Sequence, residues 1–280
     1  MHVHVNGINL FFDVEGAKLR PDGPRMREVP TLVLLHGGPG FDHSLFKPAF
    51  ADVAQFAQVV YLDLRGHGRS DSGPTDKWSV QQWAHDVHSF CDALSIEAPI
   101  VFGHSFGGIV GMHYATLYPK HPSKLVLSST STQPTGKRSF DVFERLGGLP
   151  ARDAAIAFWT HPDEASLAAY QKLCVPLYTR TAPSGESFKR VVRNPAMRLF
   201  FIEDELARLD LLMELHRVNC PTLLIGGEDD PITPIADLED IAAALPQHLV
   251  RFERFADVRH GVYRDRPGAF FGLLREFISS

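Results

Sequence analysis

The sequence predicts an α/β fold in which helices cover both faces of a mostly parallel sheet. Short apolar, β-branched runs alternate with stretches long enough for a helix, and this alternation is typical of such a sheet. A glycine-flanked serine, Ser105, stands where one of these runs ends and a helix-like segment begins. The 280 residues, 44% of them hydrophobic, are enough to bury one large core.

The first element is a predicted hairpin at the edge of the sheet. Residues 3–5 and 8–14 flank Asn6-Gly7, a pair that tolerates the positive backbone angles of a tight turn. Later runs predict further strands at residues 31–35, 59–62, 99–102, 124–127, 222–225 and 249–255. Helices are predicted between them, at residues 80–94, 108–117, 236–245 and 267–278.

The regular alternation of strand and helix stops between residues 131 and 216. Helix-patterned segments follow one another there, at residues 151–159, 163–173 and 197–215. We therefore expect a helical cap at residues 131–216, inserted into an α/β core formed by residues 1–130 and 217–280. Turn-rich stretches at residues 133–136 and 181–185 are predicted hinges or exposed loops. Helical packing without a lid function is the alternative.

Composition excludes several kinds of partner. The formal net charge is −5 and the Lys and Arg residues are scattered, so we expect no nucleic-acid partner. No apolar run is long enough to span a membrane and the opening residues lack the features of a secretion signal, so the expected location is cytoplasmic. Cys91, Cys174 and Cys220 are far apart and are expected to be buried thiols.

Neither a metal nor a cofactor is expected. The 14 histidines contain no His-Glu-x-x-His pattern, and the helical pair His85 and His88 has no nearby third ligand in the sequence. Gly66-His67-Gly68 lacks the spacing of a dinucleotide loop. The expected partner is a small-molecule substrate, and the chain is expected to be a monomer or a homodimer.

Ser105 is the candidate nucleophile. It lies in a Gly-x-Ser-x-Gly pattern in which Gly103 and Gly107 let neighbouring backbone approach closely while the serine stands at the tip of a strained turn. The predicted strand at residues 99–102 precedes it and a helix ended by Pro119 follows it, which is the context that this pattern requires.

A serine hydroxyl needs a base and an orienting acid to become a nucleophile near neutral pH. Functional groups in open α/β sheets gather beyond the carboxyl ends of strands, so the base and the acid are expected at those positions. Asp230 follows the strand at 222–225 and is the preferred acid, with Asp229 as its competitor. His260 follows the last strand and is the preferred base, whereas His248 precedes that strand.

Backbone amides are needed to stabilise the oxyanion that forms when a carbonyl is attacked. The glycine-rich stretch at residues 36–40 follows a predicted strand. It would bring the amide of Gly38, or less favourably that of Gly37, opposite the amide of Phe106. A glycine loop that only packs beside the serine is the alternative.

These residues together resemble the α/β-hydrolase superfamily over nearly the whole chain. The stretch at residues 36–40 and the Asp-Leu-Arg-Gly-His-Gly-Arg-Ser segment at residues 63–70 are similar to signatures of the prolyl iminopeptidase group. Residues 227–234 are similar to the acid-bearing turn of the superfamily, which supports Asp230 over Asp229. Arg259-His260-Gly261 departs from the commoner Gly-His, which bears on the shape of that loop.

The resemblance implies a hydrolase but does not select a substrate, because esterases, lactonases, aminopeptidases, perhydrolases and carbon–carbon hydrolases share this frame. Four cap aromatics are candidates for an apolar substrate pocket, although such residues also form cores. They favour hydrolysis of a small hydrophobic ester or lactone through an acyl-enzyme, with no cofactor. The four are Phe158, Trp159, Phe200 and Phe201.

Two alternatives remain open at this point. The first is an aminopeptidase of the prolyl iminopeptidase type, which removes an N-terminal residue. Some similar aminopeptidases carry an acid just after the triad aspartate, where this chain has Pro231, but Glu203, Asp204 and Glu205 would serve instead if they faced a substrate's amino terminus. A solvated helix face is the simpler interpretation of these acids. An alternative of another class is a catalytically weak ligand-binding receptor on the same frame.

Overall fold

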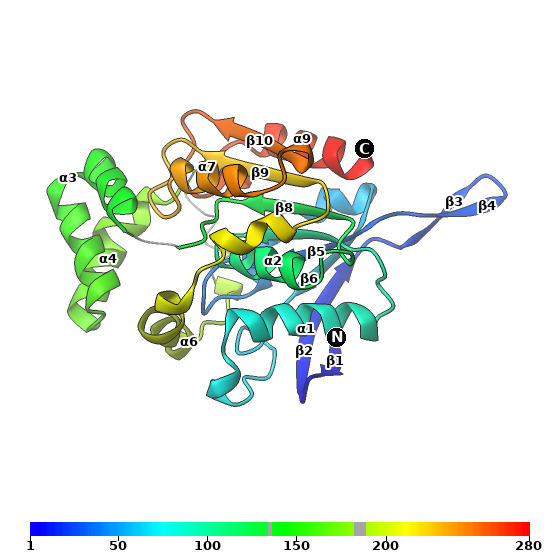
Figure 1. The fold of residues 1–280 in the computed structure, drawn as a ribbon, viewed down its shortest axis with the longest axis horizontal. Helices are drawn as coiled ribbons and strands as arrows, with labels where there is room; N and C mark the ends of the chain where they lie inside the picture. Colours follow the sequence, from blue (N-terminus) through cyan, green and yellow to red (C-terminus); the bar gives the residue numbers. More distant parts are fainter. Residues whose placement is uncertain (134–135, 182–188) are drawn as a thin grey trace.

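The computed structural model describes residues 1–133, 136–181 and 189–280. Its centre is an eight-stranded sheet with the order β1-β2-β6-β5-β7-β8-β9-β10 (Figure 1). The strands are β1 (His2–Val5), β2 (Ile8–Glu15), β5 (Thr31–Leu35), β6 (Gln58–Leu62), β7 (Ile100–His104), β8 (Lys124–Ser128), β9 (Thr222–Gly227) and β10 (Val250–Phe255). From β6 to β10 all neighbours are parallel, which confirms the predicted mostly parallel sheet.

The antiparallel edge is the predicted hairpin of β1 and β2. Asn6 and Gly7 have φ of 47° and 77°, the positive values that the turn requires. A second hairpin, β3 (Leu19–Asp22) and β4 (Arg25–Glu28), projects away from the sheet (Figure 1). The sequence analysis missed it, because its residues are mostly exposed and show no apolar alternation.

Helices cover both faces of the sheet, as predicted. Val33 and Leu35 of β5 pack in the core on the side of α1 (Val80–Ala93), α2 (Phe106–Leu117) and α7 (Ile235–Ala244). Leu32 and Leu34 of the same strand face α8 (Val262–Asp265) and α9 (Pro267–Ser279). Each face of β5 is therefore buried, because successive side chains of a strand point to opposite sides.

The segment between β8 and β9 is mainly helical, with α3 (Lys137–Thr160), α4 (Glu164–Leu173) and α6 (Pro195–Phe200) as its main helices. In Figure 1, α3, α4 and α6 lie beyond the carboxyl ends of the parallel strands. A kink with φ of 74° at Gly148 interrupts α3 just before Pro150. The division into core and cap stays a prediction, and the predicted turns at residues 133–136 and 181–185 lie largely outside the described residues.

The continuous helix predicted at residues 197–215 is wrong. After α6 the chain forms a π-helical turn, Phe201–Glu205, and then the 3₁₀ turns Leu206–Arg208 and Leu212–Arg217. A tertiary contact accounts for the break, since the buried Glu205 carboxylate accepts a hydrogen bond from the Val80 amide at 2.6 Å. That contact satisfies an amide in the first turn of α1.

The structure also bears on the expectations for the cysteines and for membrane-spanning segments. Cys91, Cys174 and Cys220 are buried and form no disulfide, as predicted. Among the described residues, no helix has both the length and the apolar character needed to cross a membrane.

The contact of α2 with the sheet is unusually close. A Cβ added to Gly107 would lie 2.1 Å from the carbonyl oxygen of Leu35 in β5. A Cβ on Gly103 would lie 2.5 Å from the carbonyl oxygen of Gly107. Any side chain at either position would therefore push α2 away from the strands that it covers.

We predict that Gly107→Ala destabilises the fold severely, while Gly111→Ala on the same helix does not. A Cβ on Gly111 would meet only side chains, at 3.6 Å or more, and alanine stabilises a helix interior by about 1 kcal/mol relative to glycine. Urea unfolding of both variants measures the difference. Equal stability of the two variants would mean that the close contact does not limit stability.

Candidate active site

Ser105 stands in the sharp turn between β7 and α2. Its φ of 54° and ψ of −121° are rare for a residue with a side chain, so the turn is strained. Two contacts hold it, since the Ser105 amide donates to the Ser128 carbonyl at 3.0 Å and the Thr130 hydroxyl donates to the Ser105 carbonyl at 2.8 Å. The side chain is partly exposed at the base of a pocket.

The structure brings His260 and Asp230 to Ser105. The Nε2 atom of His260 lies 3.0 Å from the Ser105 hydroxyl oxygen. On the other side of the ring, Nδ1 lies 2.9 and 3.0 Å from the two carboxylate oxygens of Asp230. The carboxylate accepts the Nδ1 proton, so Nε2 faces the serine without one and is able to receive its proton.

The two neighbouring aspartates have different surroundings. Asp230 is 1% exposed and accepts further hydrogen bonds from the amides of Ile232 and Thr233, at 2.8 and 2.9 Å. Asp229 instead pairs with Arg145 and Arg180, at 2.5 and 3.1 Å. Only Asp230 therefore contacts His260.

A second histidine, His104, also lines the pocket but remains neutral. Burial, and then the charges of His260 and Arg264, lowers its pKa well below the usual value. Its Nδ1 donates to the Ser128 carbonyl at 3.1 Å. The His104 ring is therefore a neutral wall beside His260, with ring centroids 5.1 Å apart.

The glycine loop at residues 36–40 lies against the serine. A Cβ on Gly37 would be 3.4 Å from the Cβ of Ser105, and Gly38 has a φ of 149°, which favours glycine. No described residue accepts a hydrogen bond from the amide of Gly38 or of Phe106, the first residue of α2. Both amides therefore keep their donor capacity for a ligand.

His36 ties this loop to the segment that follows β6. Its Nδ1 donates to the Gly37 carbonyl at 2.9 Å, and its Nε2 accepts from the Leu64 amide at 3.3 Å. Burial lowers the pKa of His36, so the ring is neutral and one nitrogen can accept. Asp63, next to Leu64, accepts hydrogen bonds from the backbone amides of His43 and Arg69, at 3.0 and 2.9 Å. Its carboxylate thereby links two further segments near the glycine loop.

The pocket above Ser105 has a volume of about 160 Å³ and mostly apolar walls. Phe158 and Trp159 line it, where the sequence analysis placed them. In the described parts of the chain, no Asp or Glu lines the pocket. The remaining walls come from the glycine loop and the residues after it, from the helical segment and from the turn after β9: Gly37, Gly38, Pro39, Phe41, Leu45, Leu167, Tyr170, Gln171, Val175, Tyr178 and Ile232.

Two cationic side chains that the sequence analysis did not identify also line the pocket. Arg198 of α6 and Arg264 of α8 both contribute to its wall. Arg264 stacks on the Tyr263 ring, with its guanidinium carbon 4.9 Å from the ring centroid. Arg198 falls within the helix predicted at residues 197–215. The spacing of residues along a helix does not indicate which charged side chain faces the pocket.

Four other predicted substrate residues are not among those that line the pocket, which corrects that expectation. Phe200 packs edge-on against Trp78 and Phe201 against Phe106, with ring centroids 5.5 and 5.4 Å apart. Glu205 is held by α1, and Glu203 is exposed, as is the neighbouring Asp204. Phe201, Glu203 and Glu205 belong to the π-helical turn, whose backbone departs from the helix that the sequence predicts.

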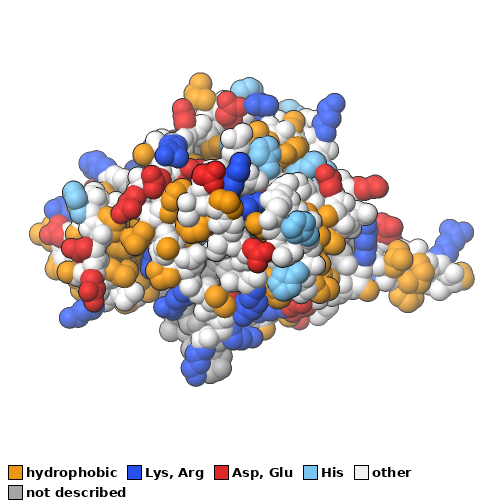
Figure 2. Space-filling model, turned by 90° about the horizontal axis from the view of Figure 1, so that it is seen from below, with side chains coloured by type: hydrophobic (Ala, Val, Ile, Leu, Met, Phe, Trp, Pro, Cys, Tyr) orange, Lys and Arg blue, Asp and Glu red, His pale blue; other side chains and the backbone are white. Residues whose placement is uncertain are grey.

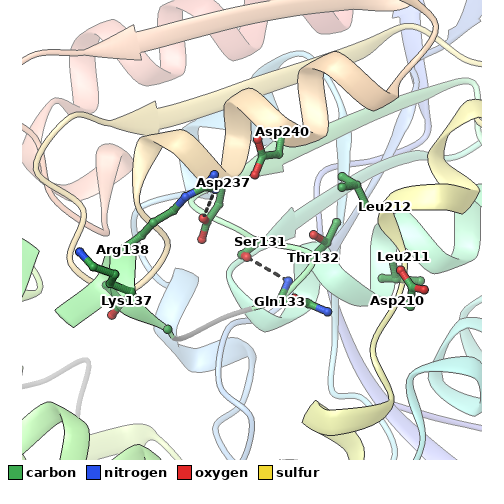
Figure 3. Close-up of a pocket in the computed structure, with 12 residues that line it drawn as sticks. Ser131, Thr132, Gln133, Lys137, Arg138, Asp210, Leu211, Leu212, Asp237 and Asp240 are labelled. Atoms are coloured by element: carbon green, nitrogen blue, oxygen red, sulfur yellow. Dashed lines mark hydrogen bonds and ion pairs between the residues drawn. The ribbon is translucent and has the colours of Figure 1, made fainter. Parts of the chain in front are cut away.

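A larger pocket of about 380 Å³ lies between α3 and α7 (Figure 3). Arg138 there already pairs with Asp237 and Asp240, at 3.1 and 2.6 Å. No histidine is among its described lining residues, so it offers no base to activate a serine. The smaller pocket at Ser105 is therefore the candidate active site.

A group of potential metal ligands lies elsewhere. Histidines gather on the face seen from below in Figure 2. His88, Asp92 and His121 offer ligand atoms within 4.8 Å of one another, whereas His85, which the sequence analysis paired with His88, is not part of this group. His121 precedes β8, at the opposite end of the sheet from Ser105, so this group is separate from the pocket.

A curated relative matches almost the whole chain. It is the putative carbamate hydrolase RutD of Escherichia coli O7:K1 (strain IAI39 / ExPEC), which is 29% identical over 268 residues. The match covers 94% of this chain and 96% of the relative.

Solved structures share the fold over their full length. The proline iminopeptidase of Mycobacterium smegmatis has a TM-score of 0.79 at 23% identity, covering 100% of this chain and 97% of that chain. The N-acyl homoserine lactone degrading enzyme Est816 has a TM-score of 0.70 at 22% identity, covering 99% and 100%. The chain also matches the alpha/beta hydrolase fold family over residues 30–267. It therefore belongs to the alpha/beta hydrolase family, which confirms the predicted fold class and the prediction of a hydrolase.

Proposed function

We propose that this protein is a serine hydrolase that cleaves a small hydrophobic carboxylic ester or lactone. The observation that carries the proposal is the continuous chain of contacts from Ser105 through His260 to Asp230. It opens into a pocket whose walls are mostly apolar. An apolar cavity with a few converging polar groups is a common form of small-molecule site.

In the proposed reaction the Ser105 hydroxyl oxygen attacks the substrate carbonyl while His260 Nε2 takes the hydroxyl proton. Asp230 holds the ring in the required tautomer and stabilises its cation. The amides of Gly38 and Phe106 donate to the developing oxyanion. His260 then passes the proton to the leaving oxygen, which departs as an alcohol, or stays attached to the acyl group in a lactone.

Water completes the cycle by attacking the acyl-enzyme. His260 takes a proton from that water, and the tetrahedral intermediate collapses with return of the proton to the Ser105 oxygen. The product is a carboxylic acid. Nothing in this sequence of steps requires a bound cofactor.

The charge of the pocket disfavours the aminopeptidase alternative. A substrate with a free amino terminus brings an ammonium ion, which requires a nearby carboxylate once it leaves water. The lining residues that the structure describes include Arg198 and Arg264 but no acid. Glu203 and Glu205, the candidates for this task, do not line the pocket.

The experiment that tests the proposal measures kcat/KM for a series of p-nitrophenyl acyl esters, an acyl lactone and proline p-nitroanilide. A p-nitrophenyl carbamate belongs in the panel, because the Escherichia coli relative is described as a putative carbamate hydrolase. We expect ester or lactone turnover to exceed anilide turnover, and Ser105→Ala to abolish it. Dominant anilide turnover would favour the aminopeptidase.

A second prediction separates the two aspartates. Asp230→Asn should lower kcat on the order of ten-thousandfold, because an amide stabilises the wrong tautomer of His260. Asp229→Asn should leave kcat near the wild-type value, since Asp229 pairs with Arg145 and Arg180 instead. Steady-state kinetics of the two variants decide the assignment, and a reversed pattern would transfer the role of acid to Asp229.

Covalent labelling distinguishes an enzyme from the receptor alternative. We expect a fluorophosphonate to label wild-type protein rapidly, because His260 activates the Ser105 hydroxyl, and to leave Ser105→Ala unlabelled. Intact-protein mass spectrometry measures the adduct. Tight ligand binding with no adduct in the wild-type protein would support a receptor.

A further inference from the structure

Arg198 is held in place by the loop that forms the other wall of the pocket. Arg198 belongs to α6. Asn194, the residue just before this helix, donates a hydrogen bond from its backbone amide to the Gly40 carbonyl at 2.9 Å. The Asn194 side chain also donates to the Gly66 carbonyl at 2.9 Å and accepts from the Met197 amide at 3.2 Å. The position of α6 relative to the glycine loop, and so to Ser105, is therefore fixed by hydrogen bonds.

The guanidinium of Arg198 has no carboxylate partner among the described residues. It lies over the face of Phe158, with the guanidinium carbon 5.8 Å from the ring centroid. Burial lowers its pKa below the ordinary arginine value. A buried arginine is usually paired with a carboxylate. Arg65 follows this rule, because the Asp86 carboxylate accepts two hydrogen bonds from its guanidinium, at 2.7 and 2.9 Å.

A half-buried cation without an internal partner is stabilised best by an anion that enters the pocket. A guanidinium donates through a planar fork that matches the two oxygens of a carboxylate. The rings of Phe158, Trp159 and Tyr170 also line the pocket, and a contact between charged groups is stronger beside apolar groups than in water. The second cation of the pocket, Arg264, donates to the Leu45 carbonyl at 3.4 Å, so Arg198 is the one whose guanidinium has no hydrogen-bond acceptor among the described residues.

We propose that Arg198 binds a free carboxylate carried by the substrate, so that the natural substrate is an ester or lactone with a second, ionised carboxyl group. This inference rests on the proposed function, because it places the reacting carbonyl at Ser105. The carboxylate lies at the α6 side of the pocket, and the carbonyl oxygen faces Gly38. Arg198 is a specificity-determining residue in this arrangement.

A matched pair of esters tests the proposal. Mono-p-nitrophenyl glutarate ends in a carboxylate, and p-nitrophenyl isoheptanoate has the same shape with a neutral isopropyl end. We expect Arg198→Met to lower the ratio of their kcat/KM values, glutarate over isoheptanoate, by about tenfold or more, since hydrogen bonds between charged groups have that size. The isoheptanoate ester should remain a substrate of this variant.

Two control variants define the cause. Arg208→Met removes an exposed guanidinium from the turn Leu206–Arg208, outside the pocket, and should keep the wild-type ratio. Arg198→Lys should retain part of the preference, because it keeps the charge and loses the fork. If Arg198 had a purely structural role, Arg198→Met would lower kcat/KM equally for both esters. An unchanged ratio of the two kcat/KM values in this variant overturns the proposal.

Binding separates this inference from the proposed function. In the inactive Ser105→Ala background, we expect equilibrium dialysis to show that Arg198→Met weakens binding of the glutarate ester by about tenfold or more. Equal binding with and without Arg198 overturns the inference even if both esters are hydrolysed by the wild-type protein. Lost hydrolysis with intact, Arg198-dependent binding would instead contradict only the hydrolytic mechanism.

Discussion

The close contact between α2 and the sheet is the constraint on which the rest of the site depends. The helix can approach β5 only because Gly107 has no side chain, since a Cβ there would lie 2.1 Å from the Leu35 carbonyl oxygen. That approach forces a sharp turn after β7, in which Ser105 takes a φ of 54°. The surrounding hydrogen bonds maintain this strained backbone, and the hydroxyl stands clear of the helix that follows it. The serine therefore reaches His260 without any change in the turn.

The glycine loop connects the reacting end of the pocket with its distal wall. On one side, neutral His36 ties the Gly37 carbonyl to the segment that follows β6, and on the other side the Gly40 carbonyl accepts from the Asn194 amide next to α6. The loop that presents the Gly38 amide thus also sets the position of Arg198. Because one rigid segment determines both positions, the distance between an attacked carbonyl and a distal anion is fixed by the fold.

Sequence patterns predicted the features that depend on local chemistry. The parallel sheet, the turn at Ser105 and the positions of Asp230 and His260 beyond strand ends all follow from short-range patterns and one topological rule. Long-range contacts account for what was missed. Glu205 breaks a helix-patterned stretch by turning to the Val80 amide, and Arg198 enters the pocket only because α6 is bonded to a loop more than a hundred residues earlier in the chain.

Charge is the property of the pocket that separates the possible substrates. The triad geometry, the glycine loop and the fold are common to hydrolases that act on very different molecules, as the likeness to a proline iminopeptidase and to a lactone-degrading enzyme illustrates. An ammonium ion entering beside Ser105 would meet the cation of Arg198 and no lining acid in the described residues. A carboxylate would meet the same cation within mostly apolar walls, where the attraction is stronger than in water. We therefore propose that the fold determines where a carbonyl is attacked and that Arg198 of α6 selects which molecule presents it.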